Sequence, residues 1–274
     1  NVSPPHANTQ NSQPMLEPNG TIVDSYVDYG LEAADEGSEA AEARTAHNRS
    51  VPAKQAASEK ASDYPALVTA VSKDGGATWS HGGTITRDLG DGPPGFRCCL
   101  PSSTADPVSG RLYASWNSAD PTKVKLSSST NGKRWSKPVG VNRRDQSLLG
   151  VSSDVAAYDG AVSVTFGLTN ADTRSGRFGR QFVATSHDRG RHFLAPTAVG
   201  PQINYAYAAI ARGIFPGDYV GSSMTKGRLY AVWAVSSAAN AKYHQVIFGA
   251  SFDTSSTPLK AAAPTNERAA VTRP

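Results

Sequence analysis

The sequence predicts an all-β protein built from repeated sheets, and composition and internal repetition are the observations that predict it. Apolar residues make up 38% and charged residues 18% of the 274 residues, while 25 glycines and 18 prolines supply many turns. This balance is typical of turn-rich β proteins rather than helical ones. Only two cysteines are present, so a disulfide scaffold is excluded for a chain of this length.

A turn motif recurs at a nearly constant spacing. Each copy has a serine, a polar residue two positions on, a glycine two further on and an aromatic residue three further on. From Trp79 to Trp135 is 56 positions, and from Trp135 to Phe193 is 58. The three copies are Ser72, Asp74, Gly76 and Trp79; Ser128, Thr130, Gly132 and Trp135; and Ser186, Asp188, Gly190 and Phe193.

The residue types of this motif favour a β-turn between two strands. Serine and aspartate side chains hydrogen-bond nearby backbone amides, and glycine adopts a positive φ without steric cost. A second repeat, Gly-Arg-Leu-Tyr-Ala, begins at 110 and again at 227, twice the same period apart. We predict strands before the turns at 66–71, 124–128 and 181–185, and a further set at 21–26, 111–116, 161–166 and 228–235. Four strands repeated at this period are typical of a propeller blade.

The segment Ser-x-Asp-x-Gly-x-Thr-Trp at 72–79 resembles the Asp box, or BNR repeat, of sialidases and related secreted β-propellers. With the Gly-Arg-Leu-Tyr-Ala strands, the resemblance covers about residues 14–255. It implies an Asp-box β-propeller of four-stranded antiparallel blades, at about 10–90, 91–145, 146–199 and 200–255. Four blades make either a small ring or part of a six-bladed sialidase-type propeller, and we favour the incomplete ring.

Net charge and low-complexity composition distinguish two segments from the predicted blades. Residues 1–63 hold ten acidic and four basic residues, whereas the rest of the chain is basic and favours anionic partners. The Ala-, Glu- and Ser-rich stretch 31–63 has almost no bulky apolar residue, so we interpret it as an inserted low-complexity loop. Residues 256–274 are interpreted as a C-terminal tail for the same reason.

Arginines are frequent in the loops expected opposite the Asp boxes. Sialidases bind the substrate carboxylate with three arginines, and the resemblance implies the same chemistry here. Arg97, Arg180 and Arg212 are the preferred three because each lies beside a predicted strand start, although an ordinary solvent-facing role is the alternative for each. The loops contain Arg87, Arg97, Arg143, Arg144, Arg174, Arg177, Arg180 and Arg212.

The catalytic groups of a sialidase are a tyrosine nucleophile activated by a glutamate and an aspartate acid/base. By resemblance, Asp218 is the candidate acid, and Tyr219 or Tyr205 the nucleophile. The glycine-rich segment 213–221 presents Asp218 and Tyr219 just before the last blade, though a turn that starts the inner strand explains it equally well. No glutamate lies between Glu59 and Glu267, so a Tyr–Glu pair is not assembled from these blades.

Two functions therefore remain open. The first is a secreted or cell-surface glycoside hydrolase of the exo-α-sialidase type that acts on acidic glycans; the alternative is a non-catalytic Asp-box propeller that binds glycan or protein. We expect no cofactor, metal site, nucleic-acid partner or membrane span, and the oligomeric state is open. Cys98 and Cys99 are either two buried thiols, the default, or a vicinal disulfide if the protein is secreted.

Overall fold

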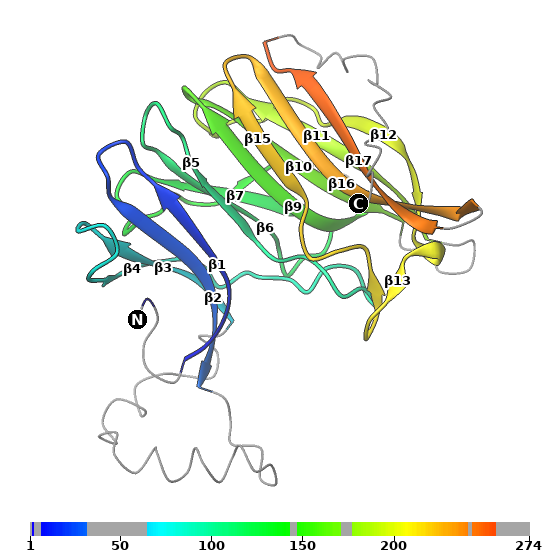
Figure 1. Cartoon of the computed structure of the whole chain (residues 1–274), viewed down its shortest axis with the longest axis horizontal. Coiled ribbons are helices and arrows are strands. Elements are labelled where there is room, and N and C mark those ends of the chain that lie inside the picture. Colours follow the sequence, from blue (N-terminus) through cyan, green and yellow to red (C-terminus); the bar gives the residue numbers. More distant parts are fainter. Residues whose placement is uncertain are drawn as a thin grey trace, which may run out of the picture.

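The computed structural model describes residues 2, 7–31, 65–142, 147–170, 177–240 and 243–255. Antiparallel sheets stand side by side in an arc, each forming one blade of a β-propeller (Figure 1). The all-β prediction and the four-stranded antiparallel blade are confirmed. Apart from Leu31, the expected inserted loop lies outside the described residues, as does the expected tail.

The first two blades follow the chain in order. Blade 1 pairs strands in the sequence β1-β2-β3-β4, and blade 2 in the sequence β5-β6-β7-β8. The outermost strand of blade 2 is very short. The strands are β1 (Ala7–Leu16), β2 (Ile22–Leu31), β3 (Ala66–Ser72), β4 (Ser80–Thr86), β5 (Ser102–Ala105), β6 (Leu112–Asn117), β7 (Val124–Ser129) and β8 (Val139–Gly140).

The third blade has the same meander, β9 to β12, while the fourth sheet contains three strands, β15 to β17. A short 3₁₀ turn at Tyr205–Tyr207 and a small β13–β14 hairpin connect the two. The strands are β9 (Leu149–Tyr158), β10 (Ala161–Thr169), β11 (Phe178–Ser186), β12 (Thr197–Asn204), β13 (Ala209–Ile210), β14 (Ile214–Phe215), β15 (Gly221–Thr225), β16 (Arg228–Asn240) and β17 (Tyr243–Asp253).

The first strand of each sheet faces the centre of the arc. Strand β1 lies against β5, β5 against β9, and β9 against β15 (Figure 1). Apolar side chains fill the space between neighbouring blades, with Tyr113 of blade 2 and Phe166 of blade 3 fully buried in one shared cluster. Strands β3 and β6 are buried at every residue, as expected for strands covered on both faces.

The first and third copies of the turn motif, which resembles the Asp box, form the predicted turn. In the first, the amide of Gly76 donates to Ser72 Oγ at 2.9 Å, and the amide of Thr78 donates to Asp74 Oδ1 at 2.9 Å. The indole of Trp79 donates to the Gly76 carbonyl. In the third box, Gly190 donates to Ser186 Oγ at 3.0 Å, His192 donates to Asp188 Oδ1 at 2.9 Å, and Phe193 packs against the core between blades 2 and 3.

The second box is displaced by one residue from the predicted alignment. Gly132 donates to the hydroxyl of Ser129, not Ser128, and Asn131 Oδ1 accepts the amides of Lys133 and Arg134. Assigning Ser128 to the turn was therefore wrong. Asn131 replaces the missing aspartate because its side-chain oxygen accepts the same backbone amides. Gly132 has φ +65 and Trp135 packs between blades 1 and 2, as this turn requires.

All three boxes connect the third and fourth strands of a blade, β3–β4, β7–β8 and β11–β12. Because successive strands are antiparallel, these turns share one end of the sheets with the turns between first and second strands. We call the opposite end the loop face; it carries the connections at 87–101, 118–123 and 205–220.

Candidate functional site

The loop face brings together two segments that are far apart in the sequence. Phe96 forms a parallel bridge with Ile214, whose carbonyl accepts the Arg97 amide at 2.9 Å. The Ile214 amide donates to the Gly95 carbonyl at 2.8 Å. A Cβ on Gly213 would lie 3.0 Å from the same carbonyl, so only glycine fits this approach, at φ +148. The β13–β14 hairpin is thereby held against the loop that precedes blade 2.

Two arginines and their aromatic partners form the centre of this arrangement. The Arg97 guanidinium carbon lies 5.1 Å from the centroid of the Phe215 ring. Arg177 lies at the same distance over Phe96 and donates to the Pro94 carbonyl. The Phe96 ring meets Tyr205 edge-on, with centroids 5.0 Å apart. Arginine stacked on an aromatic face keeps its donors free for an anion. We call Phe96, Arg97, Arg177, Tyr205 and Phe215 the arginine–aromatic cluster.

The two candidate nucleophiles have different surroundings. Tyr205 is only 2% exposed, and burial raises the pKa of its phenol well above the usual value. A phenol that resists ionisation is a poor nucleophile. Tyr219 is 63% exposed on the loop that precedes β15. The geometry therefore favours Tyr219 over Tyr205 for contact with a substrate.

Both tyrosines line a small cavity of about 20 Å³ between blades 3 and 4, enough for a single oxygen-sized group. Three other lining residues come from strands β9, β11 and β16. Within the described part of the chain, Ser152 Oγ, Gln181 Nε2 and Trp233 Nε1 are buried and make no hydrogen bond. Buried donors without partners are costly, so this cavity favours an acceptor oxygen.

Asp218 and Arg212 lie on the same connection. Asp218 is partly exposed and has no hydrogen bond or ion pair to another described residue. Arg212 is exposed and adopts φ +57 at the tip of the β13–β14 hairpin. Arg97 is also exposed, and none of the three is neutralised by a partner among the described residues. The loop face therefore carries free charge of both signs.

Arg180 does not belong to the arginine–aromatic cluster. It lies on β11 and lines a separate groove with Leu168 and Phe182. Arg177 contacts the loop at 94–96 instead. Proximity to a strand start did not distinguish the two, because it does not show towards which side of a blade a side chain points.

Cys98 and Cys99 form a disulfide beneath this cluster. The default expectation of two buried thiols was therefore wrong. Cys99 Sγ accepts the amide of Ser152 on inner strand β9 at 3.3 Å. A Cβ on Gly92 would lie 2.4 Å from Cys99 Sγ, so the loop at 92–99 closes tightly around the two sulfurs. The disulfide therefore anchors this loop next to the centre of the arc.

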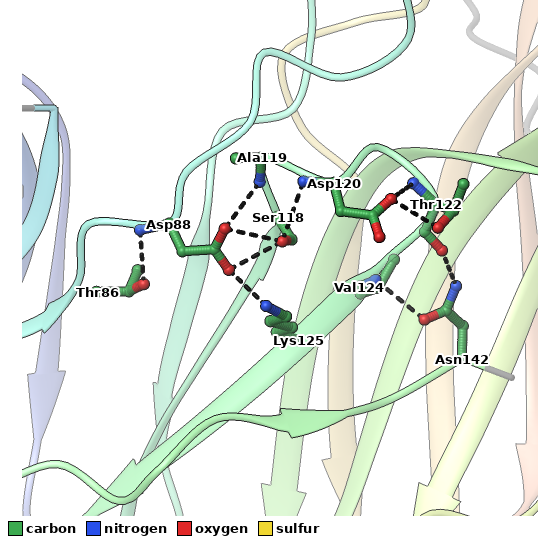
Figure 2. Close-up of polar contacts among 9 residues, drawn as sticks. All are labelled: Thr86, Asp88, Ser118, Ala119, Asp120, Thr122, Val124, Lys125 and Asn142. Carbon is green, nitrogen blue, oxygen red and sulfur yellow. Dashed lines mark hydrogen bonds and ion pairs between the residues drawn. The ribbon is translucent and has the colours of Figure 1, made fainter. Parts of the chain in front are cut away.

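Asp88 is a carboxylate of the loop face that lies outside the sequence motifs. Figure 2 shows it between blades 1 and 2, where its oxygens accept the Ser118 hydroxyl, the Ala119 amide at 3.1 Å and Lys125 Nζ at 2.6 Å. Partial burial pushes its pKa upward, but the hydrogen bonds from Lys125 and Ser118 outweigh it and hold the pKa below the usual value. Asp88 is thus an ionised carboxylate that links two loops by hydrogen bonds, rather than a proton donor.

Asp106 and Asp154 also join blades and were also missed. Asp106 accepts the amides of Asp159 and Gly160 across the boundary between blades 2 and 3, at 2.9 and 2.8 Å. Asp154, on β9, accepts the hydroxyls of Ser102 on β5 and Ser222 on β15. A charged residue within an otherwise uncharged strand segment, as at 150–157, is the signal that would have found Asp154.

No protein-family model matches the chain, and no curated protein matches its sequence. Within the described ranges, no helix has the length and hydrophobicity needed to span a membrane.

Solved structures share the fold at low sequence identity. The Hadza microbial sialidase Hz136 is 12% identical with a TM-score of 0.50, over 93% of this chain and 46% of that chain. A protein of unknown function from Dyadobacter fermentans is 13% identical with a TM-score of 0.50, over 96% and 66%. An α-L-arabinofuranosidase from Fusarium graminearum is 14% identical with a TM-score of 0.48, over 93% of this chain and 64% of its own length. The two likenesses with a TM-score of 0.50 show a shared fold, consistent with the β-propeller that the sheets form. This chain spans less than two thirds of the length of each of the three structures.

Proposed function

We propose that the protein is a secreted glycoside hydrolase of the exo-α-sialidase type that acts on acidic glycans at the loop face. The observation that carries the proposal is Arg97, exposed, stacked on Phe215 and without a carboxylate partner among the described residues. A free guanidinium fork matches the carboxylate of an acidic sugar. The likeness to a protein described as a sialidase points to the same class of substrate.

Substrate binding and catalysis are assigned to different residues of the loop face. Arg97 and Arg212 bind the sugar carboxylate, and Arg177 holds Phe96 and the loop at 94–97 in place. Tyr219, which is exposed, attacks the anomeric carbon and releases its phenol proton to water, while Asp218 donates a proton to the leaving glycosidic oxygen. Asp218 then takes a proton from the water that breaks the glycosyl–tyrosine bond, which restores both side chains. Tyr205 fixes the position of the Phe96 ring through their edge-to-face contact.

Turnover of a fluorogenic α-sialoside by the full-length protein tests this assignment. Loss of the nucleophile in Tyr219→Phe, or of the acid in Asp218→Asn, should lower kcat by about a hundredfold or more. Tyr230→Phe and Asp159→Asn are matched controls, because Tyr230 is exposed on the blade 4 sheet and Asp159 lies in a turn at the Asp-box end. Absent turnover by the parent protein, or equal rates in all variants, would refute the proposal.

A non-catalytic propeller that binds glycan or protein is the second candidate. It is favoured by the lack of any glutamate between Glu59 and Glu267, which leaves Tyr219 without the usual activating base. In that case a glycan array should show binding to acidic glycans that Arg97→Gln abolishes, while no sialoside is hydrolysed. Hydrolysis that depends on Tyr219 would exclude this candidate.

A further inference from the structure

A groove on the face of blade 3 that is turned towards blade 2 lies apart from the arginine–aromatic cluster. It has a volume of about 420 Å³, within the range of ligand sites. Its walls come from blade 3 and from the chain just before it, and they are mostly apolar. The lining residues that matter here are Leu148, Leu168, Phe178, Arg180, Phe182 and Gln202.

The short outermost strand of blade 2 explains why this groove is open. Strand β8 pairs with β7 only at Lys125↔Gly140 and Leu126↔Val139. Blade 3 continues much further with β11 and β12, so part of its face towards blade 2 has no strand of the described residues opposite it. Cross-strand pairing places Leu168 opposite Arg180, and Phe182 opposite Ala198, on that one face.

The floor of the groove is rigid and aromatic. Phe182 is half-buried and stacks on the fully buried Phe166, with ring centroids 6.1 Å apart and planes at 19°. Phe178 is also half-buried at the start of the same strand. Ring faces of this kind carry partial negative charge and attract polarised C–H groups, such as those on one side of a sugar ring.

Arg180 is the positively charged side chain among the described residues that line this apolar surface. Its side chain is exposed, and it has no ion pair or hydrogen bond to another described residue. Among the described residues, no acidic side chain lines the groove. The exposed amide of Gln202 adds a donor and an acceptor beside it. A guanidinium over an apolar floor favours a ligand that combines a carboxylate with an apolar face.

We propose that this groove is a second glycan-binding site, which takes a uronic acid residue of an acidic polysaccharide. The sugar ring packs on Phe178 and Phe182, its carboxylate pairs with Arg180, and a hydroxyl contacts Gln202. The site is independent of the proposed hydrolase activity, because it shares no residue with the arginine–aromatic cluster, Asp218 or Tyr219.

Calorimetric titration of the full-length protein with tetragalacturonic acid tests this site. Arg180→Gln should weaken binding by about tenfold or more, because it removes a charge-assisted pair. Arg191→Gln is the matched control: it removes the same charge from an exposed Asp-box turn and should leave affinity unchanged. Tyr219→Phe should leave it unchanged as well, which separates this site from the proposed active site.

Three outcomes would overturn the proposal. The parent protein does not bind tetragalacturonic acid, or Arg180→Gln and Arg191→Gln weaken binding equally, or neutral maltotetraose binds as tightly. Binding of decanoate that depends on Arg180, in the absence of tetragalacturonate binding, would identify the groove as a site for amphiphilic carboxylates instead. Phe178→Ala provides a second variant with an unaltered charge, and it should also weaken tetragalacturonate binding by about tenfold.

Discussion

The carboxylate of Asp154 accepts a hydrogen bond from the hydroxyl of Ser222, and this contact joins the inner strands of blades 3 and 4. The other carboxylate oxygen accepts the hydroxyl of Ser102 from the inner strand of blade 2. Burial raises the pKa of Asp154, and the hydrogen bonds from the two serines oppose that rise. One side chain therefore connects three blades at the centre of the arc.

Asp154→Ala should lower the free energy of unfolding by about 2 kcal/mol, because two hydroxyls between the inner strands lose their acceptor. Asp154→Asn retains an acceptor oxygen without the cost of desolvating a charge, so it should lose less than half as much. Urea denaturation of both variants measures the difference. Asp91→Ala, at an exposed position, controls for loss of a surface carboxylate. An Asp154→Ala variant as stable as the parent would contradict the assigned role.

Gly132 in the second Asp box is predicted to be irreplaceable for two separable reasons. It has φ +65, and an added Cβ would lie 2.8 Å from Val23 Cγ1 and 3.2 Å from Val71 Cγ2. Gly20 also has a positive φ, of +85, but a Cβ there would meet nothing within 4 Å. Gly20→Ala should cost about 1 kcal/mol from backbone strain alone, and Gly132→Ala at least about 2 kcal/mol. Equal thermal stability of the two variants would show that the Gly132 turn is not packed as described.

The Asp74 carboxyl should titrate unusually low. Hydrogen bonds from the Thr78 hydroxyl and amide, and from the Ser72 hydroxyl, lower its pKa from 3.8 to about 2. Because the folded-state pKa is depressed, the stabilisation is complete above the unfolded value and is lost as pH falls from about 3.8 through about 2. NMR titration of the Asp74 side-chain carbon measures the midpoint directly.

Thr78→Val is the control for that titration, because it removes the hydroxyl donor and keeps the shape of the side chain. The midpoint should move up towards 3.8 in this variant. A midpoint already near 3.8 in the parent protein would mean that the hydrogen bonds to the Asp74 carboxylate do not form in solution.

The sequence predicted the blades well because the Asp box is a local motif, with its hydrogen bonds confined to a few consecutive residues. Within the three turn motifs, the misplaced residue is Ser128 in place of Ser129, because two adjacent serines fit the spacing and Asn131 replaces the aspartate. Residues that join different blades, such as Asp88 and Asp106, were missed because their partners are distant in the sequence.

The candidate site was harder to predict for a related reason. Choosing Arg180 over Arg177 required knowing which side of blade 3 each side chain faces, and only the arrangement of neighbouring loops determines that. The burial of Tyr205 likewise depends on Phe96, from a loop more than a hundred positions away.

The central claim is that acidic sugars bind at the loop face, away from the Asp boxes. Hydrogen–deuterium exchange of the full-length protein with millimolar N-acetylneuraminic acid tests it most directly. Slower amide exchange within 94–99 and 205–220, lost in Arg97→Gln, with no change at 72–79 and 186–193, is the predicted result. Slower exchange at the Asp-box turns instead, or none at the loop face, would contradict it.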